Sequence, residues 1–341
     1  MKAVTPHTAP EHGGPDALGV PLHDFSTNAN ACGPSPQALA ALQAADAVRY
    51  PDPAYTALRE RLGAFHGVAQ ERIVIAASAS EFIHRITALA AQRGVQAVLL
   101  PAHSYGDYAR AAQAWGLRVL RPGDAGQGGS ALHWACEPAS PLGCADPALD
   151  PGRAVPAGAL QVIDCAYRPL QLHAAPRACP EAAWQLWTPN KALGLTGVRA
   201  AYAIAPLDDA AEVDAAALDR LAPSWPLGAH GVALLESWTE PATQRWLDTT
   251  RRTLADWKAA QAALCAGLGW TVLPGSLANY FAARLPQDCA PELPALLAAL
   301  RAQGIKLRDC ASFGLPGCVR LGVLPPASQA ALRAAWLVAA R

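Results

Sequence analysis

The strongest constraint in this sequence is a regular alternation of helix-like and strand-like segments that starts near Tyr50. Residues 55–68, YTALRERLGAFHGV, carry apolar side chains at helical spacing, and residues 72–77, RIVIAA, are typical of a buried strand. The same order then returns as helix-like 81–94, strand-like 97–101, helix-like 104–116 and strand-like 118–122. This alternation favours an α/β fold in which helices sandwich a mainly parallel sheet.

The pattern changes twice along the chain, which suggests where domains divide. Residues 121–160 are rich in Gly, Pro and Ala and interrupt the alternation, which resumes with the strand-like 160–167, LQVIDCAY. From about residue 230 long Ala- and Leu-rich helices follow, with strand-like segments on either side of the helix-like 292–304. We therefore expect an N-terminal arm that forms part of a small domain (1–47), a large domain (48–230) and a smaller α+β domain (231–341).

Composition excludes several classes of protein. With 52% hydrophobic and 16% charged residues, the chain of 341 residues has enough apolar material for a sizeable core. A formal net charge of zero gives no bulk attraction to nucleic acid or to an acidic membrane. The sequence has neither an apolar run long enough to span a bilayer nor an export-signal core, so we expect a cytoplasmic protein. The nine cysteines lack CxxC pairs, so we expect reduced, mostly buried thiols and no metal site.

Lys191 is the first candidate for chemistry. Only four of the 27 basic residues are lysines, and this one follows a Pro-Asn turn and precedes GLTGVR, which predicts a loop beside closely packed backbone. An amine can lose its proton and act as a nucleophile, whereas a guanidinium cannot. Considered alone, Lys191 could also be an ordinary surface lysine.

Polar groups also follow two of the predicted strands. Asp164 lies in a buried strand end, where open α/β sheets present residues to a ligand, although a structural strand-end cap is the alternative. Residues 76–81, AASASE, join a strand to a helix, where free backbone amides and serine hydroxyls can bind a phosphate. With Lys191 these groups supply what pyridoxal phosphate needs: an amine for a Schiff base, a carboxylate for the ring nitrogen and a phosphate turn. Further groups of suitable type are Tyr105, Tyr167 and Arg199.

These residues stand in a sequence that resembles the aspartate-aminotransferase-fold family of pyridoxal phosphate enzymes, in the branch of histidinol-phosphate aminotransferases and threonine-phosphate decarboxylases. The resemblance covers nearly the whole chain, from HGG at 12–14 through HDFSTNANACGPSP at 23–36 to GIKLRDCASFGLPGCVRLGV at 304–323. The first two segments together resemble the opening of threonine-phosphate decarboxylases, and the last resembles the end of the same enzymes. The resemblance implies a fold type I enzyme, pyridoxal 5'-phosphate as its cofactor, and a homodimer with shared active sites.

The resemblance also implies roles for single positions. It makes Lys191 the Schiff base lysine, Asp164 the partner of the pyridine nitrogen and Tyr167 a donor to the ring hydroxyl. Further cofactor contacts are expected from Tyr50, which would reach the neighbouring subunit's cofactor, and from Ala79, Ser80, Glu81, Tyr105, Ser140, Thr188 and Arg199. Substrate contacts are expected from Arg320 at the carboxylate, and from Arg308, Asn30 and His12. For Arg308 a solvated surface arginine is the alternative.

The chain departs from the family pattern in three places. Ala77 and Ala79 stand where the phosphate turn usually has glycines, and Asn190 precedes the lysine where serine is common. The family's NPNNPTG segment corresponds to EPASPLG at 137–143, so Ser140 replaces an asparagine that normally bonds to the ring hydroxyl. The shorter side chain allows weaker cofactor binding or an altered pKa of that hydroxyl.

The reaction that the resemblance favours is decarboxylation of L-threonine O-3-phosphate to (R)-1-aminopropan-2-yl phosphate, a step in cobalamin biosynthesis. The Cα bond that breaks is the one perpendicular to the cofactor ring, so transamination of the histidinol-phosphate type is the alternative. A non-catalytic, ligand-binding descendant of the fold is a third reading, because the asparagine segment is altered. Either His12 or His23 could contact the small phosphorylated amino-acid substrate, and no nucleic acid or membrane partner is expected.

Overall fold

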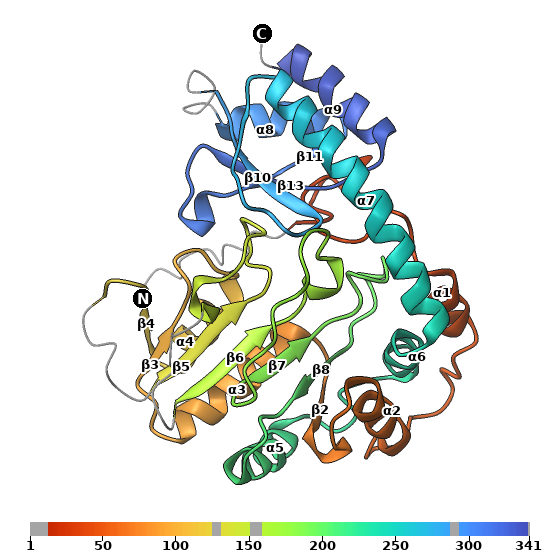
Figure 1. The fold of residues 1–341 in the computed structure, drawn as a ribbon, viewed down its shortest axis with the longest axis vertical. Coiled ribbons are helices and arrows are strands. Elements are labelled where there is room, and N and C mark those ends of the chain that lie inside the picture. Colours follow the sequence, from red (N-terminus) through yellow and green to blue (C-terminus); the bar gives the residue numbers. More distant parts are fainter. Residues whose placement is uncertain (1–12, 125–130, 151–158, 287–292, 340–341) are drawn as a thin grey trace, which may run out of the picture.

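The computed structural model describes residues 13–124, 131–150, 159–286 and 293–339 (Figure 1). Its main feature is a seven-stranded sheet with the strand order β2-β8-β7-β6-β5-β3-β4. All of these strands run parallel except β8, so the prediction of a mainly parallel sheet in an α/β fold is confirmed. The strands are β2 (Ile73–Ala76), β3 (Ala97–Leu99), β4 (Arg118–Leu120), β5 (Ala131–Cys136), β6 (Leu160–Asp164), β7 (Trp184–Trp187) and β8 (Ala201–Ile204).

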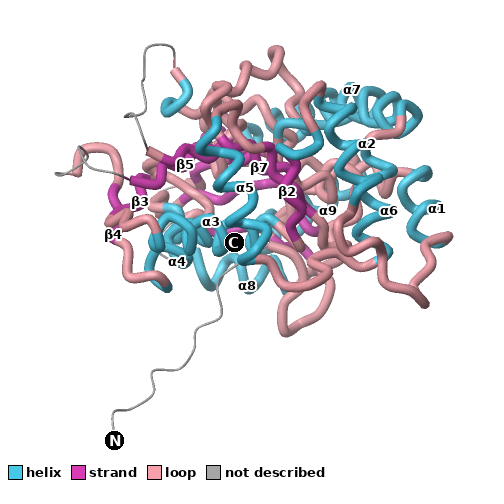
Figure 2. The backbone as a smooth tube through the Cα atoms, turned by 90° about the horizontal axis from the view of Figure 1, so that it is seen from below, coloured by secondary structure: helices cyan, strands magenta, loops and turns pink. Residues whose placement is uncertain are grey.

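Helices cover both faces of this sheet, and β2 shows why. Val74 and Ala76 pack into one apolar cluster, whereas Ile73 and Ile75 pack into another on the opposite face. A strand that is buried on both sides has no polar face, which explains its continuous apolar run. The first cluster contains α3 (Ala79–Gln92), α4 (Gly106–Ala114) and α5 (Asp209–Leu221). The second contains α1 (Pro36–Gln43), α2 (Thr56–His66), α6 (Ala229–Trp238) and part of α7 (Pro241–Gly267), which gather at the β2 end of the sheet (Figure 2).

A second, smaller body is built from the C-terminal part of the chain. Its antiparallel sheet has the order β12-β13-β10-β9, formed by β9 (Thr271–Val272), β10 (Tyr280–Arg284), β12 (Arg308–Asp309) and β13 (Cys318–Gly322). It packs with α8 (Leu293–Ala302), α9 (Pro326–Ala339) and the end of α7 around one apolar cluster. Short one-turn helices occur at Gln70–Arg72, Pro147–Leu149, Arg168–Leu170 and Ala311–Phe313.

The N-terminal segment belongs to this smaller body through both backbone and side chains. The short strand β1 (His23–Asp24) pairs in parallel with β11 (Ile305–Lys306), and the fully buried Phe25 packs into the small-domain cluster. At the other division, α6 and the first half of α7 pack with the large sheet, and α7 continues into the smaller body (Figure 1). The division at residue 230 therefore stays a prediction, because no break in packing marks it.

Two features of the large sheet were not predicted. β5 lies inside the Gly, Pro and Ala-rich segment that interrupts the sequence pattern, yet it pairs with both β3 and β6. Its six residues, ALHWAC, are too few and lack a regular alternation of apolar and polar side chains, so the sequence alone does not predict a strand. The pairing with β3 and β6 makes this segment a strand. The antiparallel direction of β8 is the second feature: β7 connects to β8 through the loop 188–200, which contains Lys191, and not through a helical crossover.

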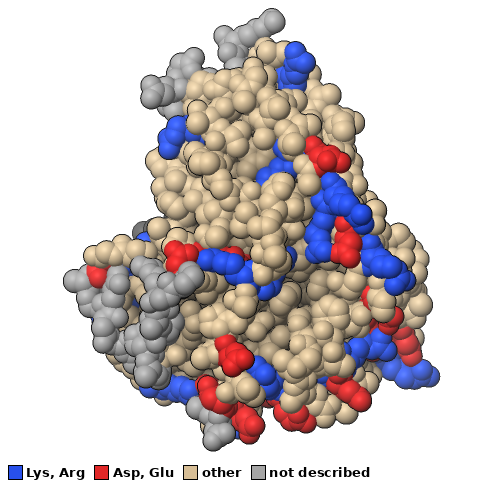
Figure 3. Space-filling view, in the orientation of Figure 1, with Lys and Arg blue, Asp and Glu red and all other residues tan. Residues whose placement is uncertain are grey.

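Charged side chains of both signs are mixed over the surface in the view of Figure 3. Along α7 and across the lower part of that view, Lys and Arg side chains lie next to Asp and Glu side chains. Among the helices that the structure describes, none combines the length and the apolar character needed to cross a bilayer.

Candidate active site

The candidate site lies at one edge of the large sheet, where several parallel strands end. β2, β5, β6 and β7 run in the same direction, so their carboxyl ends meet at this edge, which is the usual ligand position in open α/β sheets. Ala76, the last residue of β2, pairs with Ala201 at the start of β8. Arg199, two residues before Ala201, therefore lies near the turn that follows β2.

Asp164 is held at the end of β6 by two hydrogen-bond donors. The Tyr108 hydroxyl donates to its Oδ2 at 2.6 Å, and the Ala166 amide donates to its Oδ1 at 2.9 Å. Burial raises the pKa of Tyr108 well above its usual range, so the phenol keeps the proton that it donates. Tyr108 stacks on Trp134 with ring centroids 4.3 Å apart, which fixes the donor as well. Asp164 thus presents a buried carboxylate of fixed orientation.

Sequence reasoning missed Tyr108. The available signal was its position one helical turn beyond the predicted Tyr105, because residues three apart share a helix face. Tyr105 itself stands edge-on to Tyr108, with ring centroids 5.7 Å apart.

Lys191 extends its amine toward Tyr167. The Nζ atom lies 5.1 Å from the centroid of the Tyr167 ring, and the Tyr167 hydroxyl accepts a hydrogen bond from Asn28 Nδ2 at 3.4 Å. Asn28 Oδ1 is buried and has no hydrogen-bond partner among the described residues. The structure therefore brings together Lys191, Tyr167 and an amide with an open acceptor.

Asn30, two residues after Asn28, was expected to line the substrate pocket. Asn30 Nδ2 donates to the Ala192 carbonyl at 3.1 Å and to Thr250 Oγ1 at 2.9 Å, and its Oδ1 accepts from the Cys32 amide. Its backbone amide also donates to the Lys191 carbonyl at 2.9 Å. Asn30 thus anchors the N-terminal arm against the lysine loop, and its contact with substrate stays a prediction.

The turn after β2 forms a capped helix start. The Ser78 hydroxyl accepts from the Glu81 amide at 3.1 Å. Glu81 Oε2 accepts from the Ala77 amide at 3.1 Å, so the pair resembles a capping box shifted by one residue. Glu81 also pairs with Arg85, at 3.0 Å from Arg85 Nε. The predicted cofactor residue Glu81 therefore serves to build the turn. The Ala79 and Ser80 amides belong to the first helical turn, where backbone donors lack intrahelical partners and favour an anion.

The Ser80 side chain makes a contact that the sequence did not predict. Its hydroxyl donates to Asp107 Oδ2 at 2.6 Å and lies 3.4 Å from the Tyr105 hydroxyl. Asp107 is buried and pairs with Arg110 at 2.8 Å, which offsets its charge. A bound phosphate would thus be held by the amides of this turn, and a contact with the Ser80 hydroxyl would require that hydroxyl to leave Asp107.

Thr188 and Arg199 provide further groups for an anion at this edge. The Thr188 hydroxyl is buried and has no partner in the described part of the chain, which is costly unless a bound group completes its hydrogen bonding. Arg199 is exposed. A buried orphan hydroxyl, free helix-start amides and an arginine together fit a phosphate-bearing cofactor.

Two buried arginines of the small domain face the edge from the other side. Arg320 on β13 and Arg308 on β12 are paired in register, and both guanidinium groups lie over the Phe313 ring, at 5.7 and 4.8 Å from its centroid. Arg308 is only 5% exposed and donates to Ser312 Oγ at 2.8 Å, so the alternative of a surface arginine is wrong. Two buried cations on neighbouring strands favour an anionic ligand.

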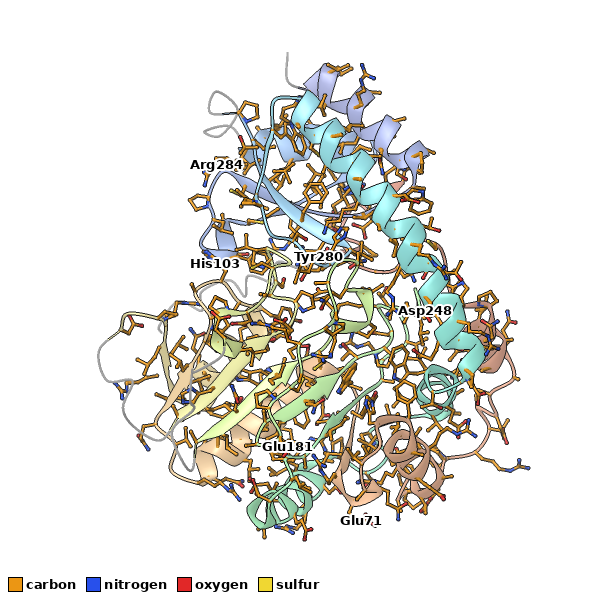
Figure 4. The ribbon with its side chains drawn as sticks, in the orientation of Figure 1. Glu71, His103, Glu181, Asp248, Tyr280 and Arg284 are labelled. Carbon is orange, nitrogen blue, oxygen red and sulfur yellow. The ribbon has the colours of Figure 1, made fainter. Side chains whose placement is uncertain are left out.

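Arg320 connects the two domains. It donates to the Ser140 hydroxyl at 3.1 Å and to the Ser26 carbonyl at 2.9 Å, and its Nε has no hydrogen-bond partner in the described residues. It lies 5.7 Å from the ring centroid of Tyr280, a residue at the junction of the two sheets in Figure 4. Ser140, predicted to face the cofactor, therefore supports the arginine predicted to bind the substrate carboxylate.

The segment around Ser140 is fixed by a buried ion pair. Glu137 is fully buried, and Arg177 donates to its two carboxylate oxygens from Nε at 2.9 Å and from Nη2 at 2.8 Å. Glu137 also accepts from the Asp146 amide at 2.8 Å. A bidentate pair of this kind holds the chain rigidly as it passes the site.

The structure describes the surroundings of two of the three remaining candidates. Tyr50 is 77% exposed and stacks on Trp225 with ring centroids 4.5 Å apart. His12 lies outside the described residues, and His23 is within 3.0 Å of the Ser328 hydroxyl on α9. Over the described ranges, no group of three His, Cys, Asp or Glu side chains is arranged to hold a metal ion.

The chain is similar to known proteins in both sequence and fold. A family model described as aminotransferase class I and II matches residues 21–123 and 185–335. A histidinol-phosphate aminotransferase of Paramagnetospirillum magneticum is 28% identical over 323 residues, which cover 88% of this chain and 86% of that protein.

Solved structures share the fold. The histidinol-phosphate aminotransferase of Sinorhizobium meliloti, in complex with pyridoxal-5'-phosphate, has a TM-score of 0.77 at 23% identity, covering 92% of this chain and 89% of that one. The L-threonine-O-3-phosphate decarboxylase of Porphyromonas gingivalis has a TM-score of 0.70 at 20% identity, covering 92% and 98%.

The ion pair beneath Ser140 gives a prediction about stability. Replacing Arg177 with Met leaves the Glu137 carboxylate buried without its partner, which should lower the free energy of unfolding by about 3 kcal/mol or more. The matched control is Arg49→Met, because the Arg49–Asp46 pair is exposed and such pairs contribute less than about 1 kcal/mol. Urea unfolding at pH 7 measures both values, and equal losses in the two variants would contradict the role given to Glu137.

Proposed function

Because the chain belongs to the class I and II aminotransferase family, we propose that it transaminates a small phosphorylated amine or amino acid, as enzymes of the histidinol-phosphate type do. It is a pyridoxal phosphate-dependent enzyme. The observation that carries the proposal is the buried Asp164 carboxylate, fixed by two donors at the same sheet edge as the Lys191 amine.

The residues of this edge fit the cofactor group by group. Lys191 would hold it covalently, Asp164 would face its ring nitrogen, and Tyr167 its ring hydroxyl. Thr188, Arg199 and the first amides of α3 would bind its phosphate. When bound, the cofactor supplies an electron sink for the pair released at the substrate Cα.

The side chains of this protein supply positions and proton transfers. Asp164 would favour a proton on the ring nitrogen, because a neighbouring carboxylate stabilises the positive charge. Tyr108 and the Ala166 amide keep Asp164 in place, so they act as positioning groups. The Lys191 amine, beside Tyr167 and Asn28, is the group that moves a proton at the substrate Cα. Arg320 binds a carboxylate, and Ser140 and the Ser26 carbonyl orient its guanidinium.

The order of the two candidate reactions differs from the one that the sequence motifs favoured. The opening and closing motifs favoured decarboxylation, but the relative compared above in sequence is a histidinol-phosphate aminotransferase, so transamination comes first. Arg320 suits this reaction because an amino donor such as glutamate carries a carboxylate. Family membership, with Lys191 and Asp164 both present, leaves no support for a non-catalytic protein.

Decarboxylation of L-threonine O-3-phosphate, as a step of cobalamin biosynthesis, is the second candidate. The specific observation in its favour is the Arg308–Arg320 pair, since this substrate carries a carboxylate and a phosphate at the same time. Both arginines are buried on neighbouring strands over Phe313, so one small dianionic substrate could engage both.

Borohydride reduction of the holoenzyme should attach a pyridoxyl group to Lys191 alone. Lys258 is the most informative comparison, because burial lowers its pKa to about 8 and makes this amine easier to deprotonate than an ordinary lysine. However, its Nζ donates to the Ser276 and Ala278 carbonyls at 2.7 and 2.8 Å, away from Asp164. Peptide mass mapping locates the label, and a label on Lys258 would remove the basis of the proposal. Lys191→Ala should lose turnover, and Lys191→Arg should not restore it.

The reaction itself is decided by two parallel assays. In the first assay the purified enzyme receives histidinol phosphate and 2-oxoglutarate, and we expect it to form glutamate. In the second it receives threonine phosphate, and we expect it to release no carbon dioxide. Carbon dioxide without glutamate would select the second candidate.

Arg320→Ala should lower kcat/KM for a carboxylate-bearing substrate by roughly 30- to 1,000-fold, which corresponds to about 2 to 4 kcal/mol. The control is Arg284→Ala on the neighbouring strand β10, whose side chain is exposed and should leave kcat/KM unchanged.

We also propose a homodimer in which Tyr50 reaches the cofactor phosphate of the neighbouring subunit. Its exposure and its stacking on Trp225 support this, because the ring is held outward at the surface. Mixing Lys191→Ala with a weakened Tyr50→Phe protein should then create heterodimers with one site free of both lesions, and activity should exceed that of either parent. If subunits exchange without any gain in activity, Tyr50 does not act across an interface.

A further inference from the structure

Two cysteines lie next to the carboxyl end of β6, where Asp164 is located. Cys165 is the next residue after Asp164 and is fully buried, and Cys179 packs against it from residues 173–182, the loop that leads to β7. The two side chains lie close enough that each shifts the pKa of the other. Both share a small apolar cluster with Ile163 and Ala183, so they are neighbours although 14 positions separate them in the sequence.

The surroundings of the two thiols differ. Arg168 Nη1 lies 3.5 Å from Cys179 Sγ, and the same guanidinium donates to the Arg177 carbonyl, which fixes its position. The Cys165 thiol and this guanidinium hold the pKa of Cys179 below its usual range, whereas burial raises the pKa of Cys165. Cys179 is also the partly accessible member of the pair. Cys179 therefore has the properties of an attacking thiolate, and Cys165 has those of a resolving thiol.

From this arrangement we infer that Cys179 is a peroxide-reactive cysteine and that Cys165 resolves its oxidised form into an intramolecular disulfide. In the first step Cys179 sulfur attacks one peroxide oxygen, the O–O bond breaks, and sulfenic acid and water form. In the second step Cys165 sulfur attacks the Cys179 sulfur, an S–S bond replaces the S–O bond, and a second water leaves. The two thiols lose two electrons, and the peroxide gains them.

The disulfide would act on the active site through the backbone. Cys165 lies between Asp164 and Ala166, whose amide orients the Asp164 carboxylate, and the Cys165 amide donates to the Leu186 carbonyl at 2.8 Å. A bond from Cys165 to the loop pulls on this strand end. The expected effect of the disulfide on activity rests on the proposed role of Asp164. We expect turnover to fall about tenfold to a hundredfold, since shifts on the order of 1 Å at a catalytic group have such effects.

The test uses the holoenzyme treated with hydrogen peroxide, followed by alkylation of free thiols and peptide mass mapping. We expect a peptide pair joined through Cys165 and Cys179 with the loss of two hydrogen atoms, and dithiothreitol should reverse it. Cys179→Ser should keep its basal activity and resist inactivation. In Cys165→Ser, which keeps the size of the buried side chain, Cys179 should stop at the sulfenic acid or oxidise further. Cys144→Ser is the matched control, because Cys144 is also partly accessible but burial raises its pKa.

The mass measurement does not depend on any activity, so it separates this inference from the proposed function. Oxidation that falls first on Cys144 or Cys32, or a Cys179 that never joins Cys165, would overturn the assignment of the pair. A disulfide that forms fully while turnover stays unchanged would overturn the coupling to Asp164. An enzyme inactive in both substrate assays that still forms the disulfide would support the redox pair and refute only the proposed reaction.

Discussion

A buried carboxylate is stable only where donors replace the water that it has lost, and Asp164 shows how this protein meets that requirement. The Tyr108 hydroxyl and the Ala166 amide take one carboxylate oxygen each. Tyr108 can reach Asp164 only because α4 packs on the sheet face and Trp134 stacks on its ring. The helix layer therefore not only covers the sheet but also fixes the charge on which the site depends.

The same requirement explains how the two domains meet. Arg320 and Arg308 are buried cations on the small sheet, and Arg320 donates to Ser140 and Ser26, which belong to segments far apart in the sequence. Phe25 secures the N-terminal arm in the small-domain core, so the arm carries Ser26 and Asn28 to the junction. Glu137 and Arg177 hold the Ser140 segment from the large-domain side. An anion bound by the arginines would thus contact groups that only the packed domains bring together.

Sequence reasoning found the positions that a chemical role or a local pattern marks, and it missed those that depend on a partner. Lys191 stood out because lysine is rare in this chain, and Asp164 because an acid ends a buried strand. Asn28, which the sequence did not single out, is the asparagine that contacts Tyr167, whereas Asn30 donates to the Ala192 carbonyl. Ser80 was read as a phosphate ligand, but its hydroxyl donates to Asp107, 27 positions away. Nothing local distinguishes a serine that faces solvent from one that faces a buried carboxylate.

The sequence by itself determined the layers of the fold, because the spacing of apolar residues reports which faces of a helix or strand must leave water. It also determined the ends of several elements, such as α2, which closes at Gly67 with a φ of 68°. Only the tertiary structure decided that β5 is a strand, that Tyr108 supports Asp164 and that Cys165 and Cys179 share one apolar cluster. The physical reason is the same in each case: a hydrogen bond or a contact between distant residues has an energy only at a particular distance and angle, and the packed chain alone sets these.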